Sequence, residues 1–199
     1  MNDETFQPPM QWEQSMVEIP TLIVPGIGNS GPKHWQTVWE GRHPLWRRVV
    51  QRDWDHPDCD EWVRAFAAAV AACAVPPLII AHSIGCLVVA HWASRSAVPI
   101  RAAFLVAVPD PDGPGFPSAA KGFAPLPLAP LHCSSVVVAS TDDPYGSVLH
   151  AQRCAAAWGS ACVSIGGAGH INAESHLGAW PEGFTVLTRL IAQADSNSR

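Results

Sequence analysis

An apolar run, a single serine and a second apolar run follow one another directly in the middle of this chain. Residues 78–81 and 84–90 are apolar apart from one glycine, and Ser83 lies at the junction. The first run predicts a strand buried on both faces and the second an apolar helix. Such a turn needs small residues two positions before and after the serine, because strand and helix pass close together there. Ala81 and Gly85 meet this requirement, so the serine hydroxyl is expected to project from the end of a sheet.

The composition predicts one folded domain and excludes several classes of partner. The chain has 199 residues, of which 48% are hydrophobic, which suffices for one core but not comfortably for two. Its formal net charge is -5 and its basic residues are scattered, so we expect no nucleic-acid partner. No apolar run reaches the length of about 18 residues that a membrane helix needs, so no membrane association is expected.

The first residues and the cysteines indicate the compartment. Residues 1–18 are polar and lack the basic start and apolar centre of a secretory signal, so we expect a loose N-terminal leader and a cytoplasmic protein. The six cysteines show no C-x-x-C pairing, and most lie in apolar segments. They are therefore interpreted as buried free thiols rather than as disulfides or a zinc site.

Apolar segments of strand and helix type alternate along residues 19–199, which we expect to form a single domain. The expected strands cover residues 21–24, 48–50, 78–81, 102–108, 136–139 and 162–165. The expected helices cover residues 34–40, 58–73, 84–94 and 152–158, and a last helix begins at Pro181. Alternation of this kind predicts an α/β fold, in which a doubly wound, mostly parallel six-stranded sheet carries helices on both faces.

One long connection does not fit a regular element. Residues 109–131 contain seven prolines and three glycines, so they cannot form a continuous helix. The segment is either a surface connection or a loop over a functional site, and its length favours the second alternative.

An acid and a histidine follow two later strands at the same end of the expected sheet. Asp142 and Asp143 come directly after residues 136–139, and His170 follows residues 162–165 through a glycine-rich turn. A nucleophilic serine needs a histidine to accept its proton and a carboxylate to orient that histidine. The chain order serine, acid, histidine is that of the α/β-hydrolases. We therefore predict a catalytic triad of Ser83, Asp143 and His170, with Asp143 preferred over Asp142.

The loop after the first strand can supply part of an oxyanion hole. The backbone N–H after the nucleophile belongs to Ile84, and a second N–H is expected from the glycine-rich loop at residues 26–31. Ile27 is our choice for that second donor. Glycines in this loop allow its backbone to approach an acyl oxygen closely.

The same loop also fits the dinucleotide-binding pattern G-x-G-x-x-G. Asp53 stands where a ribose-binding acid would follow the second strand. Pro32 argues against this alternative, because the helix of a dinucleotide site should already be packing on the sheet at that point. A dinucleotide site would also leave the triad residues without an explanation.

Four segments together resemble a known family. They are residues 24–35 (Val-Pro-Gly-Ile-Gly-Asn-Ser-Gly-Pro-Lys-His-Trp), 81–86 (Ala-His-Ser-Ile-Gly-Cys), 140–145 (Ser-Thr-Asp-Asp-Pro-Tyr) and 169–175 (Gly-His-Ile-Asn-Ala-Glu-Ser). The chain is similar to the small serine hydrolases related to retinoblastoma-binding protein nine and bacterial YdeN, from about residue 20 to residue 183. The resemblance implies a compact α/β-hydrolase without a large lid domain, with the sheet order 2-1-3-4-5-6. It also supports Asp143 as the acid, since the family's acid directly precedes the proline. Ala81 replaces the commoner glycine of the elbow.

Three further residues near these segments are weighed as site residues. His82 is expected to have a structural role, because its neighbour position points it away from the face of the serine. Trp35 is a candidate for the substrate pocket, although core packing is the favoured alternative for a tryptophan in a chain with nine. Asn172 is a candidate for substrate contact, and the alternative is that it caps a turn that holds His170.

The sequence thus predicts a serine hydrolase of the carboxylesterase or amidase type that cleaves an ester or amide bond of a small substrate through an acyl-enzyme. No metal and no cofactor are expected, because the histidines lack metal-ligand spacing. A monomer is expected. The alternative is a protein-interaction module that uses an α/β-hydrolase fold with a weak or idle triad.

Overall fold

The structure, a computed structural model, describes residues 19–197; the predicted leader at residues 1–18 lies outside them. The strands are β1 (Thr21–Val24), β2 (Arg47–Arg48), β3 (Leu78–His82), β4 (Ala102–Val106), β5 (Ser134–Ala139) and β6 (Ala161–Ser164). The helices are α2 (Trp35–Arg42), α3 (Cys59–Ala71), α4 (Ile84–Ala93), α5 (Val148–Trp158) and α6 (Pro181–Asn197), with a short 3-10 helix η1 (Ala173–Ser175).

The six strands form one sheet in the order β2-β1-β3-β4-β5-β6, and every neighbouring pair is parallel. The predicted sheet order is therefore confirmed. The chain runs from β1 to the edge strand β2 and then returns to place β3 on the other side of β1. This reversal opens a crevice at the carboxyl ends of β1 and β3, where ligands bind in sheets of this kind.

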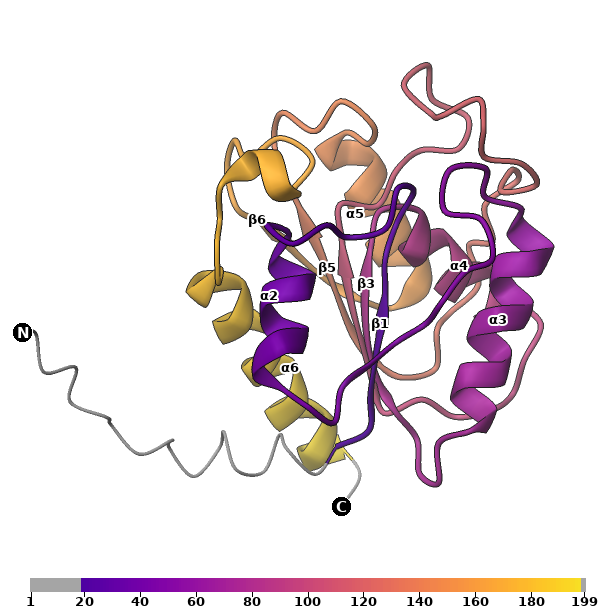
Figure 1. Cartoon of the computed structure of the whole chain (residues 1–199), viewed down its shortest axis with the longest axis vertical. Helices are drawn as coiled ribbons and strands as arrows, with labels where there is room; N and C mark the ends of the chain where they lie inside the picture. Colours follow the sequence, from indigo (N-terminus) through magenta and orange to yellow (C-terminus); the bar gives the residue numbers. More distant parts are fainter. Residues whose placement is uncertain (1–18, 198–199) are drawn as a thin grey trace, which may run out of the picture.

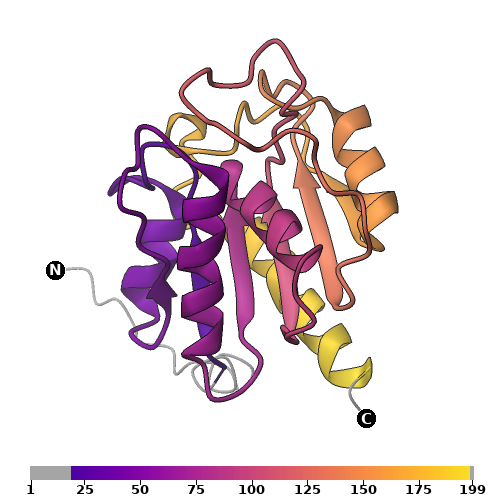
Figure 2. The same cartoon turned by 90° about the vertical axis from the view of Figure 1, so that its right-hand side faces the viewer.

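Helices cover both faces of the sheet (Figure 1; Figure 2). On one face α2 and α6 pack through an aromatic cluster that includes Trp35, Trp39 and Trp180. On the other face α3, α4 and α5 bury residues such as Phe66 and Trp92. The four inner strands β1, β3, β4 and β5 are almost entirely buried, as expected for apolar strands covered on both faces. The edge strand β6, also predicted from an apolar segment, is mostly exposed. The described residues contain no inserted lid domain.

The ends of several elements differ from the predicted ones for local reasons. β4 ends at Val106 because Ala107 has a φ of 56°, which interrupts the extended backbone. α5 begins at Val148, four residues before the predicted start, because the Ser147 side chain accepts a hydrogen bond from His150 N–H and caps the helix.

All six cysteines are free thiols. Cys59, Cys86 and Cys154 are buried, and burial raises the pKa of the Cys59 thiol to about 11. Cys162 is exposed, in contrast to the burial expected from its apolar segment. Among residues 19–197 no helix has both the length and the apolar character needed to cross a bilayer.

Candidate active site

Ser83 lies at the turn between β3 and α4 in a backbone conformation that is rare for a residue with a side chain. Its φ is 55° and its ψ is -129°, which is a strained region that persists only where the surrounding structure enforces it. Packing around the turn does enforce it: a Cβ on Gly85 would lie 2.3 Å from the backbone oxygen of Val24. Gly85, two residues after the serine, thus lets α4 begin directly against β1.

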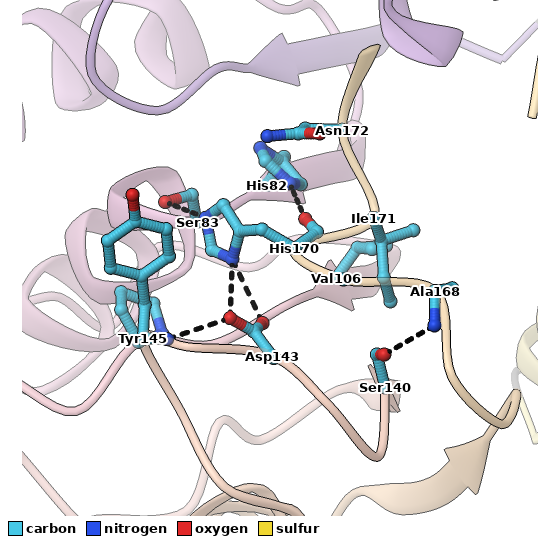
Figure 3. A network of polar contacts seen from close by, with 12 residues as sticks. His82, Ser83, Val106, Ser140, Asp143, Tyr145, Ala168, His170, Ile171 and Asn172 are labelled. Carbon is cyan, nitrogen blue, oxygen red and sulfur yellow. Dashed lines mark hydrogen bonds and ion pairs between the residues drawn. The ribbon is translucent and has the colours of Figure 1, made fainter. Parts of the chain in front are cut away.

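The structure brings Ser83, His170 and Asp143 into one hydrogen-bonded row (Figure 3). His170 Nε2 is 2.8 Å from Ser83 Oγ, and His170 Nδ1 is 2.9 Å from both carboxylate oxygens of Asp143. The carboxylate can only accept, so Nδ1 carries the ring proton and Nε2 is free to accept the serine hydroxyl proton. The side chain of Asp143 is 2% exposed and that of His170 10%, which protects the row from water.

Asp142 does not join this row but holds the loop that carries His170. One of its carboxylate oxygens accepts hydrogen bonds from the Ser140 hydroxyl at 2.6 Å and from the backbone N–H groups of Ala168 and Gly169 at 2.8 Å each. The hydrogen bond from Ser140, followed by that from Gly169, lowers the pKa of Asp142. The two adjacent acids therefore make separate contacts. Asp143 contacts the imidazole of His170, and Asp142 contacts the backbone of the loop that precedes His170.

The turn after His170 is closed by its own side chains. The Asn172 side chain accepts a hydrogen bond from Glu174 N–H at 2.9 Å, and Asn172 N–H donates to Ser175 Oγ at 3.0 Å. The Ser175 hydroxyl in turn donates to the Ala168 carbonyl at 2.6 Å. Asn172 and Ser175 thus cap η1 and tie it to the loop before the histidine. Asn172 also lines the cavity over the serine, so its position is compatible with both of the alternatives stated for it.

Two rings flank the imidazole of His170. His82 Nε2 donates to the backbone carbonyl of His170 at 2.9 Å, and the two rings are 4.9 Å apart. The Tyr145 ring lies 4.5 Å from the His170 ring (Figure 3). The bond from His82 agrees with its predicted structural role, but the expectation that it points away from the serine is wrong, since His82 also lines the cavity over Ser83. Sequence reasoning missed Tyr145, whose signal was available: it is the only tyrosine of the chain and follows Asp143 by two residues.

A cavity of about 270 Å³ lies over Ser83. Ile27 and Ile84, the predicted oxyanion-hole residues, both line it. A Cβ on Gly26 would lie 2.7 Å from the Cβ of Ser83, so the glycine allows the loop after β1 to approach the serine closely. The N–H of Ile84 is at the first position of α4, where backbone donors have no partner inside the helix.

The long connection at residues 109–131 contributes to the same cavity. Pro109 and Pro117 line it, and the Asp110 N–H donates to the Tyr145 carbonyl at 2.8 Å. Phe123 is buried and anchors the segment to the core. Of the two alternatives for this connection, the structure therefore supports the loop at a site.

The prediction of substrate contact for Trp35 is corrected. Its side chain is 1% exposed, does not line the cavity, and lies in the aromatic cluster under α6. The indole N–H donates to the Ile171 carbonyl at 2.8 Å. Trp35 is the first residue of α2 and points into the layer between helix and sheet, which agrees with the packing alternative.

The glycine-rich loop differs from a dinucleotide-binding loop. α2 begins at Trp35 with His34 as its N-cap, so Gly31 does not open the helix as the third glycine of that pattern does. The Asp53 carboxylate accepts from the N–H groups of Asp55 and His56 and thus stabilises its own turn.

Two other hollows in the described part of the chain lie outside this cavity, and one of them, of about 520 Å³, is lined by residues that include Arg52, Asp53 and Lys121. The larger hollow, of about 630 Å³, lies at the opposite end of the sheet and is lined by residues that precede β4, β5 and β6. Within residues 19–197 no cluster of three histidine, cysteine or acidic side chains is arranged to hold a metal ion.

The fold, with a serine at the turn after β3, an acid after β5 and a histidine after β6, is that of an α/β-hydrolase. The chain belongs to the serine hydrolase family, whose model matches residues 21–189. A search of curated proteins found no match.

Solved structures agree with this assignment. A YdeN-like hydrolase from Pectobacterium atrosepticum is 32% identical, with a TM-score of 0.81, and the match covers 93% of this chain and 99% of that one. The ydeN gene product from B. subtilis is 16% identical, with a TM-score of 0.74 over 87% of this chain and 99% of the other. A thermophilic esterase from Thermogutta terrifontis is 17% identical, with a TM-score of 0.61 over 86% and 88% of the two chains.

Proposed function

We propose that the protein is a carboxylesterase or amidase that cleaves small substrates through an acyl-enzyme on Ser83. The observation that carries this proposal is the hydrogen-bonded row from Ser83 through His170 to Asp143 at the floor of a cavity. An intact, protected row of this kind favours an enzyme over an interaction module with an idle triad.

The acylation step follows from the positions of the ring nitrogens. His170 Nε2 removes the proton from Ser83 Oγ as the oxygen attacks the substrate carbonyl carbon. The carbonyl oxygen becomes an oxyanion, which the N–H groups of Ile27 and Ile84 stabilise. The protonated His170 then gives its proton to the departing alcohol or amine. Asp143 keeps the ring oriented and stabilises its positive charge.

Deacylation repeats these steps with water. His170 removes a proton from the water molecule, the hydroxide attacks the ester carbonyl of the acyl-enzyme, and Ser83 leaves with the proton that His170 returns. The products are a carboxylic acid and a regenerated enzyme. The cavity, of about 270 Å³, favours a short acyl chain.

Hydrolysis of p-nitrophenyl butyrate and butyryl p-nitroanilide tests the proposal and separates ester from amide preference. We expect Ser83→Ala and His170→Ala each to lower kcat by a factor on the order of a thousand or more. Ser196→Ala is the matched control, because Ser196 is exposed on α6. A folded wild-type protein that hydrolyses neither substrate would contradict the proposal.

A further inference from the structure

His34 carries a buried donor without a partner beside the nucleophile. The residue caps α2, is 5% exposed and lines the cavity over Ser83. Its Nδ1 accepts a hydrogen bond from Gln36 N–H at 3.2 Å, so the proton of the neutral ring resides on Nε2. Nε2 is buried and has no hydrogen-bond partner among the described residues. Buried donors of this kind are rare because leaving one unpaired is costly.

The imidazole of His34 is neutral under ordinary conditions. Burial is the main cause that lowers its pKa from 6.5 to about 3, and the positive charge of Arg48 acts in the same direction. The ring therefore carries one unpaired N–H donor and no charge, in a residue that lines the cavity.

His82 adds an acceptor to the same wall. Its Nε2 donates to the His170 carbonyl, which leaves Nδ1 as a lone-pair acceptor. The rings of His34 and His82 are 4.7 Å apart at an angle of 71°, and both residues line the cavity. Burial is the main cause that lowers the pKa of His82 well below its usual value, so this ring is also uncharged.

We propose that His34 and His82 form a binding subsite for an uncharged polar group of the substrate, with His34 Nε2–H as donor and His82 Nδ1 as acceptor. The proposal rests on the proposed hydrolase function and specifies its substrate class. A hydroxyl group or a primary amide fits, because each can accept one hydrogen bond and donate another.

The surroundings of the pair disfavour other substituents. An anionic group would face the lone pair of His82 Nδ1. It would also share the cavity with the carboxylate of Glu174, which lines it and would repel a negative charge. An apolar group would leave the His34 donor unpaired, as it is in the free protein. The subsite thus selects hydroxylated or carboxamide-bearing esters and amides.

Matched substrate pairs test the proposal, because each pair exchanges a hydroxyl for a methyl group of similar size. On the acyl side the pair is p-nitrophenyl lactate and p-nitrophenyl isobutyrate. On the alcohol side it is ethylene glycol monobutyrate and propyl butyrate. The measured quantity is the ratio of kcat/KM for the hydroxylated member to kcat/KM for the methylated member.

For at least one pair, we expect His34→Phe to lower this ratio about tenfold relative to wild type. His34→Asn, which retains an N–H donor, should restore part of the preference. His56→Phe is the matched control, since His56 is exposed and does not line the cavity. If the ratio is unchanged for both pairs, including the case in which both members lose activity equally, the proposal is overturned. His34 would then have only a structural role, through its aromatic contact with His82.

Two further measurements separate failure of the subsite from failure of the hydrolase function. Labelling of Ser83 by a fluorophosphonate shows whether the nucleophile is active in wild type and in His34→Phe. Ring-nitrogen NMR of the Ser83→Ala protein, titrated with methyl lactate and methyl isobutyrate, reports on the subsite without turnover. We expect methyl lactate alone to shift the His34 Nε2 resonance; equal responses to the two esters would contradict the subsite even if the enzyme is inactive.

Discussion

The Asp142 carboxylate accepts a hydrogen bond from the backbone N–H of Gly169, the residue directly before His170, at 2.8 Å. Gly169 has a φ of 55°, a left-handed conformation that glycine adopts without strain. A carboxylate that holds this turn determines where the next side chain points. Asp142 is therefore interpreted as a positioning residue for the imidazole, whereas Asp143 contacts the ring itself.

Removal of the Asp142 carboxylate should weaken catalysis with little change in fold stability. We expect Asp142→Ala to lower kcat about tenfold, because small displacements of a catalytic base are costly. Asp142→Asn should lose less, since its side-chain oxygen can still accept from the loop. Steady-state kinetics and thermal melting measure the two effects, with exposed Asp55→Ala as control. Identical kcat values for Asp142→Ala and the control would refute the positioning role.

Replacement of the neighbouring acid should have a much larger effect. An amide at position 143 cannot stabilise the positive charge on His170 and favours the wrong ring tautomer, so we expect Asp143→Asn to lower kcat by about a thousandfold or more. The comparison with Asp142→Asn assigns the two acids. If Asp142→Asn proved the more damaging change, the assignment would be reversed.

The elbow should not tolerate a side chain at Gly85. A Cβ there would lie 2.3 Å from the Val24 oxygen and 2.8 Å from the Pro25 oxygen, both of them backbone atoms in β1 or just after it. We expect Gly85→Ala to lower the free energy of unfolding by about 1–3 kcal/mol, as overpacking does. Gly41→Ala is the matched control: a Cβ at position 41 would meet no atom within 4 Å, and in α2 it should raise stability by about 0.5–1 kcal/mol. Urea denaturation of both variants checks the prediction, and equal effects would contradict it.

The buried histidine at position 34 should make the protein sensitive to mild acid. Its pKa in the folded state is about 3, below the ordinary 6.5, so the unfolded chain binds more protons between these values. The free energy of unfolding therefore falls as the pH decreases from 6.5 towards 3, by up to about 1.4 kcal/mol per pH unit from this group. His34→Phe should reduce that slope, although the same effect of His82 remains. Urea denaturation at several pH values measures this dependence. If the free energy of unfolding changes with pH in the same way in wild type and in His34→Phe, the prediction of a lowered pKa for His34 is wrong.

Much of the site was predictable because its parts follow the ends of apolar strands. Ser83, Asp143 and His170 each come directly after such a strand or a short turn, and parallel strands bring their carboxyl ends together. The family resemblance supplied the sheet order, which local pattern does not contain.

Other features depend on contacts between segments that are distant in sequence. The acceptor for the Trp35 indole N–H is the carbonyl of Ile171, 136 residues away. The sequence around Trp35 therefore could not show whether its side chain lies in the core or in the substrate pocket. The role of Asp142 depends equally on the turn at Gly169, 27 residues further on. The unpaired nitrogen of His34 becomes visible only when its neighbours are placed around it.

Mass spectrometry of the protein after treatment with a fluorophosphonate probe tests the central claim, that Ser83 is an activated nucleophile, most directly. We expect one covalent adduct, mapped to Ser83, which is absent in Ser83→Ala and forms much more slowly in His170→Ala. A folded wild-type protein without an adduct, or an adduct that persists in Ser83→Ala, would contradict this claim.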